Sequence, residues 1–155
     1  MNVVDWMLLI MRVRSSYRDF KEGKLGTQEK DVLIRSIDSG PSSGGLRAYS
    51  VWRTESERKK GLLQEATLNQ RFVSKAAIIF CICADPDKSK EKYGDRGWLY
   101  SIQDATIAGM CITFAATALG LGSCWVGSID EKKVRKIYNI SENHIPLSLI
   151  CIGKK

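Results

Sequence analysis

The chain has 155 residues, of which 44% are hydrophobic and 26% are charged, and its formal net charge is +7. This length fits a single domain, residues 1–155, and the composition is that of a globular protein rather than a disordered one. No stretch reaches the roughly 18–20 apolar residues that span a bilayer, so we expect a cytoplasmic protein that is neither secreted nor bound to a membrane.

The cysteines and the single histidine limit the kinds of metal site and catalytic site that the chain could form. The cysteines are odd in number, show no C-x-x-C spacing and fall mostly in apolar segments, so we expect buried free thiols in a reducing compartment. They are Cys81, Cys83, Cys111, Cys124 and Cys151. One histidine, His144, is too few for a multi-histidine metal site and argues against Ser-His-Asp or Cys-His catalysis. We therefore expect no metal, and a cofactor that carries the chemistry.

The positive charge is spread along the chain, with short clusters at residues 58–60 and 132–136. Spread-out charge is typical of a solvated surface, and an anionic cofactor needs only a few cations. A basic nucleic-acid-binding domain would need clustered arginines with interleaved exposed aromatics. That role is therefore the weakest alternative, and we expect no nucleic-acid partner.

Apolar periodicity and end signals predict the elements of the N-terminal half. In chain order these are a helix over 2–14, a helix over 27–37, a loop over 39–45, a strand over 46–54 and a helix over 56–70. Thr27 is expected to cap the second helix, which turns Val32, Leu33 and Ile37 inward. The many glycine and serine residues of the segment 39–45 mark it as a loop.

The C-terminal half continues with alternating strands and helices. It reads as a strand over 76–83, a charged loop over 85–96, a helix over 97–119, a strand over 123–126, a helix over 129–138 and a strand over 145–152. The first and last of these strands are continuously apolar, as central strands are. Gly120 and Gly122 end the long helix, and Ser128 with Glu131 forms a capping box for the next one.

This order mixes helices and strands, and no glycine fingerprint follows a first strand. The sequence therefore predicts an α+β sandwich with a central mixed or antiparallel sheet flanked by helices. The helix over 97–119 carries many small residues, which allow close packing, so we expect it to be the central core helix. It is also too apolar for solvent, which predicts that a second copy of the chain covers it.

The first of three motifs with candidate binding chemistry occupies residues 14–20. It reads Arg-Ser-Ser-Tyr-Arg-Asp-Phe. The guanidiniums of Arg14 and Arg18 bracket the hydroxyls of Ser15 and Ser16. Such a set offers charge-assisted hydrogen bonds to a phosphate and further hydrogen bonds to a polyol. A solvated turn has the same composition, so this motif is weak by itself.

The second and third motifs are rich in glycine. The second motif, residues 41–47, reads Pro-Ser-Ser-Gly-Gly-Leu-Arg, and its paired glycines let backbone amides come close to a flat ligand. The third motif, residues 118–127, reads Ala-Leu-Gly-Leu-Gly-Ser-Cys-Trp-Val-Gly. Its last glycine allows close approach of a ligand beside an aromatic wall. The alternatives are an ordinary connecting loop and an ordinary helix stop followed by a strand.

In this order and spacing the three motifs resemble those of the nitroreductase-like FMN-dependent oxidoreductases, over about residues 8–153. The resemblance implies a nitroreductase-like fold, an intertwined homodimer and bound FMN. It also implies that hydride passes from NAD(P)H through FMN to a small organic acceptor in a ping-pong sequence. FMN would carry the chemistry, so no catalytic residue is assigned to the chain. A flavin-binding protein of the same fold that is not a reductase is the alternative, acting in flavin storage or remodelling or in dehydrogenation of a peptide.

The resemblance also implies roles for the motif residues. Those expected to contact FMN are Arg14, Ser15, Ser16, Arg18, Pro41, Ser42, Ser43, Gly44, Trp125, Val126, Gly127 and Lys154. The first motif would hold the phosphate and ribityl chain, with Arg18 at the pyrimidine edge of the ring. The second motif would reach the same flavin from the other subunit, and the third would lie beside the ring. Lys154 or Lys155 would close the phosphate site.

Overall fold

A four-stranded antiparallel sheet in the order β1-β2-β4-β3 lies at the centre of the computed structural model, which describes all 155 residues. The strands are β1 (Tyr49–Thr54), β2 (Ile78–Ala84), β3 (Gly122–Val126) and β4 (Ile145–Gly153). Every residue of β2 is buried, and so are most of those of β4. The continuously apolar runs are thus the two central strands, as predicted.

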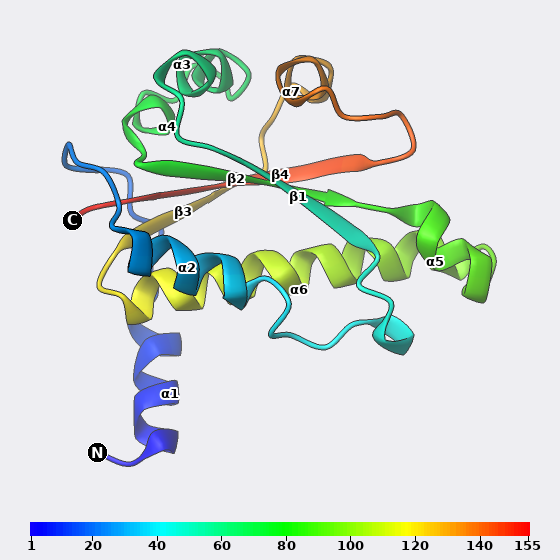
Figure 1. Cartoon of the computed structure of the whole chain (residues 1–155), viewed down its shortest axis with the longest axis horizontal. Helices are drawn as coiled ribbons and strands as arrows, with labels where there is room; N and C mark the ends of the chain where they lie inside the picture. Colours follow the sequence, from blue (N-terminus) through cyan, green and yellow to red (C-terminus); the bar gives the residue numbers. More distant parts are fainter.

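Helices cover both faces of the sheet (Figure 1). They are α1 (Val3–Val13), α2 (Thr27–Ser36), α3 (Glu57–Glu65), α4 (Phe72–Lys75), α5 (Pro86–Tyr93), α6 (Arg96–Ala118) and α7 (Glu131–Tyr138), with a short 3-10 turn η1 at Ser43–Gly45. The helices α2, α5 and α6 lie on one side, and α3, α4 and α7 lie on the other. This arrangement confirms the predicted α+β sandwich, with an antiparallel sheet.

The core has one apolar cluster on each side of the sheet. Ile82 and Ile150 of the central strands pack with Ile112 of α6 on one side. Leu149 packs with Val134 of α7 on the other side. Because two layers of helices enclose the sheet, its central strands are shielded from water on both faces.

The long helix α6 crosses the sheet and contacts all four strands, as predicted for a central core helix. Its small buried residues allow this approach: a Cβ on Gly109 would lie 2.6 Å from the ring of Trp125. The sheet of the same chain covers this face, so the apolar character of α6 does not by itself call for a partner copy. The exposed apolar helix is α1 instead, which has no buried residue.

The structure corrects one predicted loop, one helix end and two helix caps. Residues predicted as a charged loop form α5, because Asp85 caps a helix that begins at Pro86. The helix predicted over 56–70 ends at Glu65, and Leu68 and Asn69 follow with φ of 55° and 57°. The cap of α2 is Gly26 rather than Thr27, and that of α7 is Asp130 rather than Ser128.

The cysteines are free thiols, as predicted. Four of them are buried and Cys111 is half-buried. The contact of 3.8 Å between the sulfur atoms of Cys81 and Cys83, together with burial, raises the pKa of Cys81. Burial raises the pKa of Cys151 as well. These thiols therefore stay protonated and act as small apolar core residues.

None of the helices combines the length and the apolar character that a membrane crossing would require.

Candidate functional site

The first motif runs alongside the outer edge of β3. The backbone N–H of Tyr17 donates to the carbonyl of Ser123 at 2.8 Å, and Ser16 forms a parallel bridge to the same residue. Gly122 makes room for this approach, since a Cβ there would lie 2.4 Å from the ring of Tyr17. Phe20 is buried at the end of the motif and anchors it to the core. The fold therefore brings the first and third motifs side by side.

The two arginines of the first motif carry charges that the protein does not neutralise. Arg14 follows the last turn of α1 and is half-buried, whereas Arg18 is exposed and lies 5.8 Å from the centroid of the Phe72 ring. Neither forms an ion pair, and Arg18 in particular is not paired with the adjacent Asp19. Ser15 and Ser16 are exposed next to them. Unpaired guanidiniums beside free hydroxyls form a donor set that suits a phosphate.

The third motif begins at the end of α6 and continues into β3. Gly120 turns the chain with φ of 72°, and Trp125 is half-buried against Gly109 of α6. Val126 is buried, whereas Gly127 is exposed just past the strand. The charge of Arg18 offsets part of the burial that raises the pKa of the Cys124 thiol, which places the first motif beside this strand. The predicted helix stop and strand are confirmed.

The second motif is held by a residue that the sequence did not single out. Asp104 of α6 is 1% exposed, and its carboxylate accepts hydrogen bonds from the backbone N–H and the hydroxyl of Ser43, at 2.8 and 3.1 Å. Its second oxygen accepts from the N–H of Ala48 at 3.3 Å. Pro41 and Gly44 are exposed, and Gly44 has φ of 57°. A buried carboxylate therefore fixes the shape of a loop whose tip faces outward.

Within one chain the second motif lies apart from the first. Asp104 lies in the first half of α6, whereas the first motif runs beside β3, which follows the end of that helix at Ala118. Asp104 and Ala118 are roughly 20 Å apart at the usual rise of a helix. The loop lies beside α6, and the first motif lies at the edge of β3, near the end of that helix (Figure 1). One chain thus brings the first and third motifs together and leaves the second apart from the first.

The two C-terminal lysines occupy different surroundings. The ammonium of Lys154 donates to Glu29 of α2 at 2.6 Å, whereas that of Lys155 lies 5.8 Å from the centroid of the Tyr17 ring. The hydrogen bond from Lys154, followed by that from the Gly26 amide, lowers the pKa of Glu29 from its ordinary 4.5. Lys155 is therefore the lysine that lies against the first motif.

Glu29→Gln is expected to lower the free energy of unfolding by about 1 kcal/mol or less at neutral pH. Because the folded pKa of Glu29 is depressed, its contribution is present above about pH 4.5 and is lost as the pH falls through the lowered value. Urea unfolding at several pH values should show the gap between variant and parent closing below that pH. Glu22→Gln, at an exposed carboxylate without a partner, is the control. A gap that stays constant with pH would contradict this assignment.

The structure also brings Ser50, His144 and Asp85 together. The Ser50 hydroxyl lies 3.1 Å from Nε2 of His144, and a carboxylate oxygen of Asp85 lies 3.7 Å from the same nitrogen. In a hydrolase triad the carboxylate contacts the opposite nitrogen, Nδ1, and orients the ring. Here Nδ1 faces the Ser141 hydroxyl at 3.0 Å. The cluster therefore lacks the arrangement of a triad.

Comparison with known proteins adds a family model and several relatives. The model of the nitroreductase family matches residues 47–154. FMN reductase (NADPH) of Bacillus subtilis is 27% identical over 152 residues, which cover 89% of this chain and 61% of that protein. The structure of NfrA1 nitroreductase from B. subtilis has a TM-score of 0.87 at 26% identity and covers 96% of this chain and 66% of that one. An FMN-dependent nitroreductase from Clostridium difficile has a TM-score of 0.79 at 28% identity, with 94% and 86% covered. The chain thus spans less than two thirds of the length of these matches from B. subtilis.

Proposed function

The chain belongs to the nitroreductase family, and from this membership and the placement of its motifs we propose that it is an FMN-dependent NAD(P)H oxidoreductase. The observation that carries the proposal is the first motif, which presents two unpaired guanidiniums and two exposed hydroxyls along the edge of the third. Relatives whose names include FMN and NADPH support the choice of cofactor and reductant.

The donor set of the first motif fits FMN. Arg14 and Ser16 would hold the phosphate and the ribityl chain, Arg18 would face the pyrimidine edge, and the stretch from Trp125 to Gly127 would lie beside the ring. When bound, FMN supplies hydride transfer from NAD(P)H to a small organic acceptor in a ping-pong sequence. The chain itself binds and orients the cofactor and places positive charge near it, and Lys155 supplies a further cation beside Tyr17.

A second copy of the chain would complete this site. The second motif is held at Asp104, roughly 20 Å along α6 from the end of that helix, which leads into the edge of β3 where the first motif lies. Its Pro41–Gly44 portion would therefore reach the flavin of a partner subunit rather than that of its own. The helix α1 offers an interface: Trp6 and Met7 are 53% and 57% exposed, and they line an apolar hollow that continues onto Phe114 of α6. We propose an intertwined homodimer through this surface.

Trp6→Glu combined with Met7→Glu is expected to convert the dimer into a monomer, because it places charge in the apolar interface. Sedimentation at micromolar concentration measures the change. The parent should sediment as a dimer and the variant as a monomer with reduced FMN affinity. A parent that is a monodisperse monomer at this concentration would rule out the interface.

The first test of the proposed function is the absorbance spectrum of the purified protein, which should show the flavin maxima. Mixing with NADPH or NADH under anaerobic conditions should then bleach the flavin quickly, and a nitroaromatic or quinone acceptor should restore the absorbance. Flavin that stays oxidised with both nicotinamides would support the non-reductase alternative. A protein that binds no FMN at all would overturn the proposal.

Arg18→Gln is expected to lower the midpoint potential of bound FMN and to slow its reduction by NAD(P)H. A guanidinium at the pyrimidine edge interacts more strongly with the negative charge that reduction adds than with the neutral oxidised ring. Affinity for oxidised FMN should change little. An anaerobic redox titration measures the shift, and Arg18→Lys should restore part of it. If the variant and the parent have the same midpoint potential, Arg18 does not set the potential of bound FMN, and backbone amides would be the remaining groups that could do so.

A further inference from the structure

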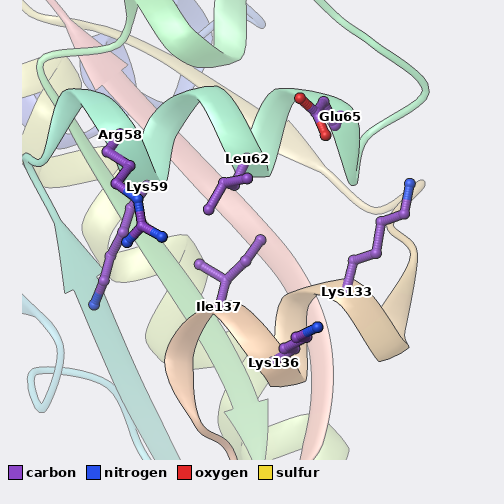
Figure 2. A pocket seen from close by; sticks show the side chains of 7 residues that line it. All are labelled: Arg58, Lys59, Leu62, Glu65, Lys133, Lys136 and Ile137. Atoms are coloured by element: carbon purple, nitrogen blue, oxygen red, sulfur yellow. The ribbon is translucent and has the colours of Figure 1, made fainter.

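A basic groove lies between α3 and α7, on the side of the sheet opposite α6 (Figures 1 and 2). Its volume is about 430 Å³. The residues that line it are Arg58, Lys59, Leu62, Glu65, Lys133, Lys136 and Ile137. None of them belongs to the three motifs. Figure 2 shows Leu62 and Ile137 facing each other between the two helices, with the charged side chains around them.

The fold gathers here two basic clusters that are far apart in the sequence. Arg58 and Lys59 come from α3, and Lys133 and Lys136 come from α7. None of the four forms an ion pair, and Glu65 is the only acidic residue that lines the groove. Like charges brought together without partners repel one another, and a multivalent anion would relieve that repulsion.

The groove offers more than charge. Leu62 and Ile137 provide an apolar floor, and the ammonium of Lys59 lies 5.7 Å from the centroid of the Tyr138 ring. A pocket of this size accommodates a small organic molecule. Single-stranded nucleic acid is usually held on exposed aromatic side chains, and none lines this groove.

We propose that the groove binds a small organic phosphate with at least two phosphate groups, of the class of a nucleoside diphosphate. The phosphates would lie among the cations of α3 and α7, and the organic part would rest on Leu62 and Ile137. This site is separate from the first motif, so binding does not depend on the oxidoreductase activity proposed above.

Calorimetric titration of the protein with ADP tests the proposal. Saturating FMN is present throughout, so that the first motif is not open to the phosphates of ADP. ADP binding is expected to weaken at least about ten-fold in Lys133→Gln/Lys136→Gln, because two charge-assisted contacts are lost. The matched control is Lys75→Gln/Lys90→Gln, which removes the same charge elsewhere and should stay within about two-fold of the parent.

Two further probes separate the parts of the ligand. Inorganic pyrophosphate should bind more weakly than ADP, since it leaves the apolar floor uncovered, and Leu62→Gln should reduce ADP affinity without changing that for pyrophosphate. The groove variant should melt no lower than the parent in the absence of ligand, because it removes repulsion.

Several results would overturn the proposal. One is a parent protein that binds no ADP, and another is an equal loss of affinity in the groove variant and the control. Equal affinity for pyrophosphate and ADP would show that the organic part of the ligand contributes nothing to binding in the groove. A short single-stranded oligonucleotide that binds more tightly than ADP, and loses that affinity in the groove variant, would assign the groove to nucleic acid instead.

Discussion

Asp104→Ala is expected to lower the free energy of unfolding by about 3 kcal/mol or more. The substitution leaves three buried or half-buried donors without an acceptor, namely the N–H and the hydroxyl of Ser43 and the N–H of Ala48. It also leaves a void beside α6, where Asp104 is 1% exposed. The second motif would lose its shape, so affinity for FMN in the proposed dimer should fall as well.

Urea unfolding measures the loss of stability, and Gln103→Ala is the matched control because Gln103 is an exposed neighbour on the same helix. The control should stay within about 0.5 kcal/mol of the parent. Asp104→Asn keeps one acceptor oxygen and should lose less than Asp104→Ala. Equal stability of Asp104→Ala and the parent would show that other contacts are enough to hold the loop.

Arg14→Ala is expected to weaken FMN binding by about 2 kcal/mol, or about thirty-fold in Kd. The guanidinium is half-buried and free of any carboxylate, so a phosphate would be its main partner. Flavin fluorescence during titration measures the affinity. Arg53→Ala removes an exposed charge from β1, at the opposite edge of the sheet, and should change Kd by less than about two-fold. Equal FMN affinity in the two variants would show that Arg14 does not contact FMN.

The sequence predicts the strands and the long helix well because each has a strong apolar pattern. The residues of β2 and β4 are apolar almost without interruption, and burial on both faces demands this. The small residues of α6 likewise reflect its contact with the sheet. Elements whose pattern follows from burial are therefore the ones that a single sequence reveals.

The helix α5 escaped prediction because only Pro86 and Ser89 of its residues are buried, which leaves no apolar stripe. The sequence does contain a start signal for this helix, because Asp85 caps it and a proline occupies its first turn. The segment is otherwise polar, and without an apolar stripe this signal alone does not distinguish a helix from a loop. The break after α3 was hidden because Leu68 and Asn69 adopt positive φ without glycine. Local end signals carry more information than periodicity in such segments.

The motifs name candidate site residues but do not reveal how the fold holds them. Asp104 sits among apolar and small residues of α6, and no spacing rule links it to Ser43, which it contacts across the fold. The basic groove is similar, since its two clusters look like ordinary solvated charge until the fold brings α3 and α7 together. Long-range contacts of this kind follow from topology and leave no local pattern in the sequence.

The hydrogen bond from Tyr17 to Ser123 has a consequence for aggregation. An outer strand with free backbone groups invites pairing with a strand of another molecule, and natural sheets cover or interrupt such edges. Here the segment that covers the edge of β3 is also the one that carries the unpaired arginines Arg14 and Arg18. If the proposed cofactor binds this segment, it would also hold the segment against β3 and so keep the sheets of two molecules from pairing edge to edge.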